Sequence, residues 1–274
     1  MADVQKYFRE WTLPHIWCPG CGHGAVTGGV VRAIDRTGWD QDRTVIISGI
    51  GCSGRAPGYL DFNTLHTTHG RALAFATGVK MARPELNVVV LTGDGDAAAI
   101  GGNHLIHAAR RNIDITAVCY NNSIYGMTGG QYSPLTPPSR FASTAPYGNI
   151  DPSFDLCNLM VGAGASYVAR STVYHITQLI SYITAGLQKK GFAFIEAVTQ
   201  CPVVYGRRNR MGSAVDMLKW QRDNAVPVRR ARGMDPQELA GKIVIGEFTD
   251  AEAPEYTESY KKIVERAQKR GGGR

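Results

Sequence analysis

Short apolar runs rich in β-branched residues alternate along this chain with longer segments in which apolar residues recur every three or four positions. The short runs predict buried strands, and the longer segments predict amphipathic helices. We expect strands over residues 44–49, 87–93, 113–120 and 192–198, and helices over residues 22–35, 71–82, 100–112 and 173–189. This alternation predicts an α/β fold with a mostly parallel sheet that carries helices on both faces.

The chain has 274 residues, of which 43% are hydrophobic, and can bury one sizeable core. Residues 125–155 are rich in Pro, Ser, Thr and Gly and too long for an ordinary connector, so we expect a functional loop or an interface loop there. After Cys201 the sequence turns basic and irregular, and it ends with a charged helix near residues 255–270. We therefore expect an α/β domain over residues 1–204 and a C-terminal arm for subunit and partner contacts over residues 205–274.

The net charge is +7 at pH 7, and the arginines gather chiefly after Cys201. No nucleic-acid-binding motif accompanies them, so nucleic acid is not an expected partner. This basic surface either faces an acidic protein or is merely solvated, and we favour the acidic partner because opposite charges speed transient encounters. No apolar run approaches the roughly 20 residues of a membrane helix and no signal-peptide pattern precedes Trp17, so we expect a soluble cytoplasmic protein.

Candidate metal ligands follow two neighbouring strands. The expected strand over residues 87–93 ends in a Gly-Asp-Gly turn at Asp94, and the next expected strand is followed by Asn122. Parallel strands end at the same edge of a sheet, which is where open α/β sheets bind ligands. The carboxylate of Asp94, the amide oxygen of Asn122 and a loop carbonyl near Ile124 suit Mg2+, and the glycines let backbone N–H groups approach an anion. Together they predict a site for Mg2+ and a diphosphate.

An isolated Gly-Asp-Gly is most often only a turn, and paired asparagines are often only a strand cap. Here Asp94 and Asn122 stand 28 positions apart, with an expected helix and strand between them. This spacing resembles the thiamine diphosphate motif of thiamine diphosphate-dependent enzymes. We therefore expect thiamine diphosphate as the cofactor.

The six cysteines suggest a second kind of chemistry, because no secreted disulfide framework is indicated. Four lie in turns or just beyond expected strand ends and could converge: Cys18, Cys21, Cys52 and Cys201. Four thiolates can hold a structural zinc ion or a [4Fe-4S] cluster, and a lone Cys-x-x-Cys by itself favours zinc. Cys119 and Cys157 lie in apolar segments and are expected in the core. His23 opens a helix beside Cys21, and a functional and a structural role are equally expected for it.

Several ordered blocks point to one family. They are CPGCGHG, GIGCSGR, HGRALAFATGVK, GDGDAAAIGGNH, NNSIYGMTGGQYSP and a late Cys-Pro. Over roughly residues 11–210 they resemble the β subunits of 2-oxoacid:ferredoxin oxidoreductases. The YGMTGGQYSP block is most similar to members that act on 2-oxoglutarate or on a broad range of 2-oxoacids. This context favours an iron-sulfur cluster over zinc.

The resemblance implies a role for each block. One [4Fe-4S] cluster is expected on Cys18, Cys21, Cys52 and Cys201. Mg2+ is expected on Asp94, Asn122 and the backbone oxygen of Ile124. The residues expected beside thiamine diphosphate are Ile50, Gly51, Cys52, Ser53, His69, Gly95, Asp96, Gly126 and Met127. His69 and Arg55 are expected to act in catalysis, and the guanidinium of Arg55 could bind the second carboxylate of a dicarboxylic substrate or pair with a buried carboxylate.

The resemblance further implies oxidative decarboxylation of 2-oxoglutarate to succinyl-CoA and CO2, with coenzyme A as co-substrate and electrons passed to ferredoxin. The reverse, CO2-fixing direction is also open, as are pyruvate or broad 2-oxoacid specificity. A non-redox thiamine diphosphate decarboxylase or synthase subunit is the main alternative, and a zinc-stabilised module is a further one. In this family a glutamate that activates the cofactor comes from the α subunit. The expected enzyme is therefore an αβ or (αβ)2 assembly, and the isolated chain is expected to be inactive.

Overall fold

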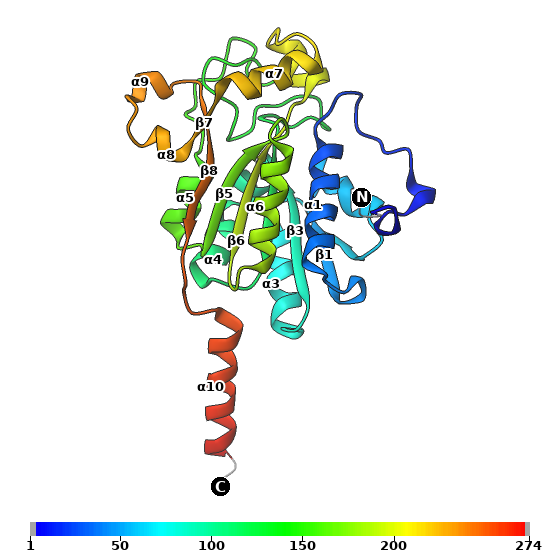
Figure 1. Ribbon diagram of the computed structural model, residues 1–274, viewed down its shortest axis with the longest axis vertical. Helices are drawn as coiled ribbons and strands as arrows, with labels where there is room; N and C mark the ends of the chain where they lie inside the picture. Colours follow the sequence, from blue (N-terminus) through cyan, green and yellow to red (C-terminus); the bar gives the residue numbers. More distant parts are fainter. Residues whose placement is uncertain (1–3, 272–274) are drawn as a thin grey trace.

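One eight-stranded sheet organises the computed structural model, which describes residues 4–271 (Figure 1). Its strands are β1 (Thr44–Ser48), β2 (Asn63–His66), β3 (Asn87–Gly93), β4 (Thr116–Asn121), β5 (Tyr167–Thr172), β6 (Ala193–Val198), β7 (Ala225–Pro227) and β8 (Ile243–Asp250). They lie in the order β2-β1-β3-β4-β6-β5-β8-β7, and every neighbouring pair is parallel except β5 with β8. The expected mostly parallel α/β fold is confirmed.

Helices cover both faces of the sheet. The longer ones are α1 (His23–Thr37), α3 (Ala72–Ala82), α4 (Gly102–Arg111), α5 (Leu156–Ala163), α6 (Ile176–Gln188), α7 (Ala214–Asn224) and α10 (Tyr256–Gly271). Three short ones are α2 (Ala56–Tyr59), α8 (Val228–Ala231) and α9 (Pro236–Leu239). Helices α1 and α6 pack on one face, and α3, α4 and α5 pack on the other (Figure 1). Each face thus has its own hydrophobic core.

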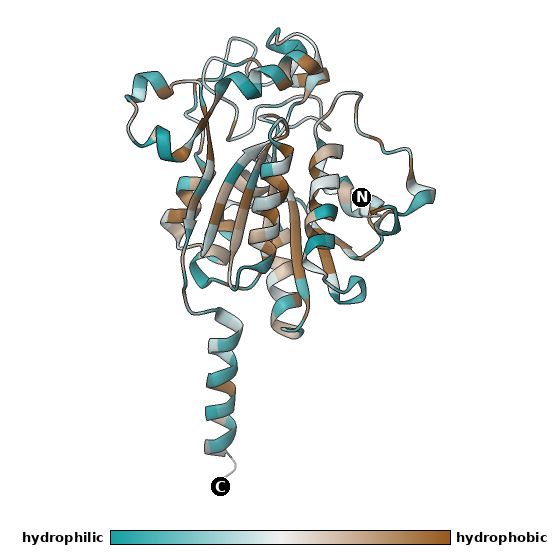
Figure 2. Cartoon of the chain, in the orientation of Figure 1, coloured by the Kyte–Doolittle hydropathy of each residue, from teal (hydrophilic) through white to brown (hydrophobic). Residues whose placement is uncertain are grey.

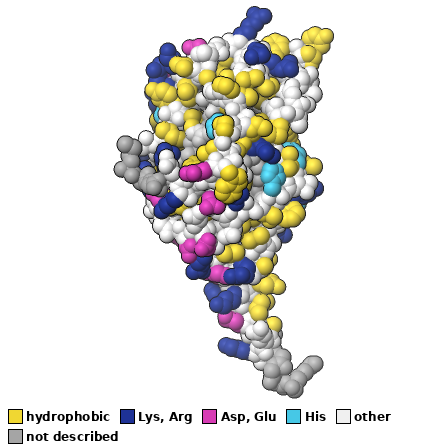
Figure 3. Space-filling view, turned by 90° about the vertical axis from the view of Figure 1, so that its right-hand side faces the viewer, with side chains coloured by type: hydrophobic (Ala, Val, Ile, Leu, Met, Phe, Trp, Pro, Cys, Tyr) yellow, Lys and Arg dark blue, Asp and Glu magenta, His cyan; other side chains and the backbone are white. Residues whose placement is uncertain are grey.

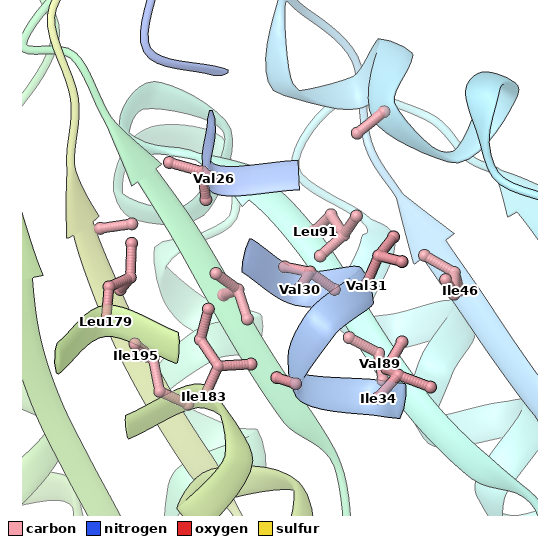
Figure 4. Close-up of a cluster of buried hydrophobic side chains, with 14 of the residues drawn as sticks. Val26, Val30, Val31, Ile34, Ile46, Val89, Leu91, Leu179, Ile183 and Ile195 are labelled. Atoms are coloured by element: carbon pink, nitrogen blue, oxygen red, sulfur yellow. The ribbon is translucent and has the colours of Figure 1, made fainter. Parts of the chain in front are cut away.

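The spacing of apolar residues in α1 explains how the first core forms. Val26, Val30 and Ile34 recur every four positions and point from one side of the helix toward β1, β3 and α6 (Figure 4). All three are fully buried, and full burial of such a side chain stabilises the fold by about 1.5 to 3 kcal/mol. The strands are correspondingly the most hydrophobic part of the chain in Figure 2. This packing fixes the sheet edge at which the expected ligand residues lie.

The residues expected to form a C-terminal arm are joined to the main domain. Strand β8 pairs antiparallel with β5, and β7 pairs with β8, so this part of the chain completes the sheet. Helix α10 stands clear of the body, at the end opposite α7 (Figure 1). The boundary at residues 204 and 205 and the partner contacts of the arm stay predictions. Among the described residues, no helix combines the length and the apolar character needed to cross a membrane.

Candidate active site

A cavity of about 540 Å3 lies at the carboxyl ends of β1, β3 and β4. Its volume is in the range of small-molecule and cofactor sites. The lining contains every residue expected beside thiamine diphosphate and Mg2+: Ile50, Gly51, Cys52, Ser53, His69, Asp94, Gly95, Asp96, Asn122, Ile124, Gly126 and Met127. The parallel register of the three strands explains why turns that are distant in sequence meet here.

Asp94 is buried directly after β3, and that burial raises the pKa of its carboxyl group to about 7. The hydroxyl of Ser133 donates a hydrogen bond to Oδ2 of Asp94, which partly opposes this increase. Asn122 is also buried, and its Oδ1 accepts a hydrogen bond from the backbone N–H of Ile124 at 3.2 Å. A buried carboxylate and an amide oxygen that line the same cavity fit Mg2+. Burial deprives the carboxylate of water, and the cation would compensate its negative charge.

The glycines of the Gly-Asp-Gly turn allow a close approach of backbone and side chains. A Cβ atom on Gly95 would lie 2.2 Å from the Cζ atom of Tyr125. The hydroxyl of Tyr125 donates a hydrogen bond to the carbonyl oxygen of Gly95 at 3.1 Å. A side chain at position 95 would therefore displace the aromatic ring from the cavity wall.

His69 is held by a buried carboxylate. Its Nδ1 atom lies 2.9 Å from Oδ1 of Asp96. Asp96 also accepts hydrogen bonds from the backbone N–H of Gly70 at 2.6 Å and from the hydroxyl of Thr92 at 2.8 Å. The His69 ring packs edge-on against Tyr125 with 6.0 Å between centroids. Both rings line the cavity, so the carboxylate fixes an imidazole against the space expected for the cofactor.

The four cysteines expected to bind a cluster are electrostatic neighbours of one another: Cys18, Cys21, Cys52 and Cys201. Burial raises the pKa of Cys21 to about 12 and that of Cys52 to about 11, and the neighbouring thiols add to both increases. Within residues 4–271, no group of three or more His, Cys, Asp or Glu side chains is arranged to hold a metal ion. The [4Fe-4S] assignment therefore stays a prediction, and the donor set, four neighbouring free thiols, fits it chemically.

A short loop separates the cavity from these thiols. A Cβ atom on Gly126 would lie 3.5 Å from Sγ of Cys52 and 3.8 Å from Sγ of Cys201. The backbone N–H of Met127 donates a hydrogen bond to the Cys52 thiol. Because Gly126, Met127 and Cys52 also line the cavity, the thiols and the expected cofactor space share one thin wall.

His23 links the two groups of residues. Its Nδ1 atom lies 3.4 Å from Sγ of Cys21, and its ring is in contact with Tyr120, 5.2 Å between centroids. Both His23 and Tyr120 line the cavity. Burial lowers the pKa of His23 to about 4, so the imidazole is neutral at physiological pH.

Arg55 stands apart from this arrangement. Its side chain is exposed and does not line the cavity, and in the described part of the chain no carboxylate pairs with it. Its role in substrate binding stays a prediction. Cys119 and Cys157 are fully buried, as expected for core residues.

Several lining residues escaped the sequence analysis: Gly93, Tyr120, Tyr125, Thr128 and Gln131. Tyr125, Thr128 and Gln131 lie in the loop after Asn122, within a block whose other members were assigned. Tyr120 is in a strand and looked like an ordinary core residue. The alternation of side chains along β4 was the signal that could have placed its hydroxyl on the face of the sheet covered by α1, where it lies 3.1 Å from Oγ1 of Thr27.

The chain is similar to known proteins over most of its length. Residues 49–197 match the family model of the thiamine pyrophosphate enzyme, C-terminal TPP binding domain. A protein of Methanothermobacter marburgensis named 2-oxoglutarate synthase subunit KorB is 56% identical, over 95% of this chain and 91% of that protein. A protein of the same name from Methanocaldococcus jannaschii is 54% identical, over 97% of this chain and 98% of that protein.

A solved structure is similar over nearly the whole chain. It is the 2-oxoglutarate:ferredoxin oxidoreductase from Magnetococcus marinus, with 2-oxoglutarate, coenzyme A and succinyl-CoA bound. The TM-score is 0.86 at 36% identity, covering 97% of this chain and 91% of the other. These likenesses cover nearly the whole chain. The chain belongs to the family of β subunits of 2-oxoacid:ferredoxin oxidoreductases, which includes the 2-oxoglutarate synthase subunits KorB.

Proposed function

We propose that this chain is the β subunit of a 2-oxoglutarate:ferredoxin oxidoreductase, active only together with an α subunit. The observation that carries the proposal is the thin wall formed by Gly126 and Met127, with the Asp94 and Asn122 side of the cavity before it and four neighbouring thiols behind it. A non-redox thiamine diphosphate enzyme needs the first half of this arrangement and has no use for the second.

The cavity residues would hold the cofactor and its metal. Asp94, Asn122 and the carbonyl oxygen of Ile124 would bind Mg2+. The diphosphate is assigned to the turns that contain Gly95, Asp96, Gly126 and Met127, and the thiazolium side to residues 50–53. Thiamine diphosphate supplies the electron sink that decarboxylation of a 2-oxoacid requires. His69 is assigned to a proton-handling or orienting role at this position, because Asp96 fixes its ring against the cavity.

The four thiols would ligate one [4Fe-4S] cluster, which supplies a one-electron relay. Overall, 2-oxoglutarate and coenzyme A give succinyl-CoA, CO2 and one proton, and two electrons leave singly to two molecules of ferredoxin. The backbone N–H groups of Met127, Val204 and Tyr205 donate hydrogen bonds to thiols of this set. Such donors stabilise the negative charge that ligating sulfur atoms carry. The reverse, CO2-fixing direction uses the same residues.

The substrate assignment rests on the relatives, whose names specify 2-oxoglutarate. Pyruvate and a broad 2-oxoacid specificity are the alternatives. We further propose that residues 1–204 form the cofactor-binding unit, that residues 205–274 make partner and subunit contacts, and that the assembly is (αβ)2.

The test is anaerobic purification of the chain with its α subunit, followed by measurement of iron, acid-labile sulfide, Mg2+ and thiamine diphosphate per αβ unit. We expect one cluster and one cofactor, and reduction of ferredoxin that requires both 2-oxoglutarate and coenzyme A. Bound cofactor with zinc in place of iron and sulfide would favour the non-redox alternative. Faster turnover of pyruvate than of 2-oxoglutarate would replace the substrate, and activity of the β chain alone would refute the need for an α subunit.

A further inference from the structure

A hollow of about 430 Å3 beside the active-site loop is rich in arginine and contains no carboxylate. Its lining is Ser139, Arg140, Phe141, Arg208, Asn209 and Arg210. Within residues 4–271, none of these three guanidinium groups forms an ion pair, and both Arg208 and Arg210 are exposed. We call this surface the arginine hollow. Three uncompensated positive charges at one place create a local field that attracts an acidic partner.

The floor of the arginine hollow is held in place by its own hydrogen bonds. The backbone N–H of Phe141 donates to Oδ1 of Asn209 at 2.9 Å, and Nδ2 of Asn209 donates to the carbonyl oxygen of Phe141 at 3.1 Å. The same Nδ2 also donates to the carbonyl oxygen of Tyr205 at 3.0 Å. Phe141 itself is 45% exposed, so an apolar ring lies among the arginines. An aromatic residue inside a charged rim is a common arrangement at protein docking sites.

The arginine hollow is connected to Cys201 by a continuous set of contacts. The backbone N–H groups of Val204 and Tyr205, in the turn after Cys201, donate hydrogen bonds to its thiol. A Cβ atom on Gly130 would lie 2.5 Å from Cγ1 of Val204 and 3.3 Å from Nε of Arg208. The arginine hollow is therefore packed directly on the turn that holds one of the four neighbouring thiols.

Gly130 also connects the arginine hollow to the active-site loop. Its backbone N–H donates to the carbonyl oxygen of Tyr125 at 2.9 Å. Tyr125 through Thr128 line the cavity, and Gly126 lies against two of the thiols. A protein seated over the arginine hollow would thus stand next to the loop and the thiols at once.

We propose that the arginine hollow is the docking surface for the acidic one-electron carrier protein that exchanges electrons with this subunit. This inference rests on the proposed function and adds the place where the carrier binds. Electron transfer requires the carrier to approach a cluster ligand closely, and Cys201 is the ligand nearest in sequence to Arg208 and Arg210. Figure 3 shows Lys and Arg side chains at the upper end of the molecule, the end that carries α7 in Figure 1.

A protein partner explains the arginine hollow better than a small anion does. A phosphate group would use the guanidinium groups but leave the exposed ring of Phe141 without a contact. An acidic carrier with an apolar patch near its own redox centre would use both. Positive charge at the rim increases the rate of encounter, and the apolar centre contributes to the lifetime of the complex.

The test compares two double charge reversals in the assembled αβ enzyme. R208E/R210E reverses two charges in the arginine hollow, and R110E/R111E reverses two exposed charges in the last turn of α4, outside the residues assigned to partner contacts. For R208E/R210E we expect Kd and KM for an acidic ferredoxin to rise by about tenfold or more at low salt. The difference from the wild type should shrink as salt is added, since the Debye length falls to about 8 Å at 0.15 M. Binding of oxidised ferredoxin is measured directly, without turnover.

Turnover with methyl viologen as the electron acceptor separates this inference from the proposed function. R208E/R210E should keep the wild-type viologen rate and the wild-type KM for coenzyme A, and R110E/R111E should match the wild type in every assay. An increase in the KM for coenzyme A with viologen would instead make the hollow a phosphate site. Loss of the α subunit from R208E/R210E would make the hollow a subunit interface. Equal effects of both variants would show that only the net charge of the protein affects ferredoxin binding. Absence of viologen turnover in the wild type would overturn the proposed function itself.

Discussion

The Nδ1 atom of His69 lies 2.9 Å from a carboxylate oxygen of Asp96, which is itself 4% exposed. Two further hydrogen bonds, from Gly70 and Thr92, hold the carboxylate. Asp96 thus orients His69 from behind, and Nε2 is the ring nitrogen left for other contacts. A carboxylate that is committed to three protein donors acts on the site chiefly through the imidazole it holds.

Asp96→Asn should lower kcat by about tenfold, because a neutral amide accepts a weaker hydrogen bond from His69 than a carboxylate does. The amount of bound thiamine diphosphate should stay unchanged. The kinetics of the reconstituted αβ enzyme, together with its cofactor content, check this expectation.

The decisive control for Asp96 is a double-mutant cycle with His69→Ala. If Asp96 acts only through His69, the double variant should be no slower than His69→Ala alone. Additive losses would show that Asp96 contacts the cofactor or the metal in its own right.

Gly95→Ala should weaken binding of Mg2+ and thiamine diphosphate by at least about tenfold, because the new methyl group would overlap the ring of Tyr125. Cofactor affinity measured by calorimetry on the assembled enzyme gives the readout. Gly102→Ala is the matched control, since nothing lies within 4 Å of a Cβ there and the position starts α4. Similar losses in the two variants would show that the Gly95 approach is not specifically required.

Cofactor binding should depend on pH through Asp94. Burial raises the pKa of this carboxyl group to about 7 from an ordinary value of 3.8, so below pH 7 the unliganded site is mostly protonated. Mg2+ needs the ionised form, and binding must then release a proton. The affinity for Mg2+ with thiamine diphosphate should fall by up to about tenfold per pH unit below pH 7 and level off above it.

Calorimetry in two buffers of different ionisation enthalpy measures that proton release. Asp94→Asn should bind more weakly and should lose the part of the release that belongs to Asp94. An unchanged proton count in Asp94→Asn would assign the release to another group, such as the cofactor phosphates.

A buried ion pair should make Arg170 important for stability. Its Nε lies 2.8 Å from Oε2 of Glu196, which is 2% exposed, and its Nη2 lies 2.6 Å from Oδ1 of Asp155. Arg170→Met would leave the Glu196 charge buried without a cationic partner, although it keeps the hydrogen bond from Nδ2 of Asn121 at 2.7 Å, and should cost about 3 to 5 kcal/mol of unfolding free energy. Urea unfolding gives the value. The double variant R170M/E196Q should recover most of the loss, and no recovery would mean that packing of Arg170 matters more than its charge.

The same residue explains why the sequence predicted the sheet only in part. Strand β5 was missed because its sequence, YVARST, places a charged residue in the middle of a short run. The buried carboxylate that pairs with this arginine is Glu196 of the neighbouring strand β6. It is 26 positions away in the sequence, so no local pattern reveals the pair. Strands without such a residue, for example β1 and β3, were predicted nearly to their ends. The antiparallel pairing of β8 with β5 likewise depends on contacts that no local pattern encodes.

The candidate site was more predictable than the sheet. Asp94 and Asn122 lie in turns directly after strands, so strand order and spacing were enough to bring them together. The position of Tyr125 under Gly95 was not predictable, since it depends on how a long loop folds back over β3. For Arg55, nearness in sequence to a cavity residue did not predict a place in the cavity wall. It is close to Cys52 in sequence, yet the helical turn that begins at Ser53 leaves its side chain exposed and outside the cavity lining.

His23 should tune the reduction potential of the cluster proposed on the neighbouring thiols. Its Nδ1 atom lies 3.4 Å from Sγ of Cys21, and its neutral ring can carry the proton on that nitrogen. Hydrogen bonds to ligating sulfur stabilise the reduced, more negative cluster. His23→Leu should therefore shift the potential to more negative values, by an amount on the order of tens of millivolts. Redox titration followed by electron paramagnetic resonance measures the shift independently of turnover.

Two further variants separate this hydrogen bond from simple repacking around His23. His23→Gln keeps a donor and should shift the potential less than His23→Leu does. Thr27→Val alters a buried residue one turn further along α1, whose hydroxyl contacts Tyr120 and not a thiol, and should leave the potential unchanged. If all three variants shift the potential alike, the packing around Cys21 controls it and the donor does not. If only His23→Leu shifts the potential, the imidazole of His23, which lines the cavity, also sets the driving force for electrons to leave the cavity.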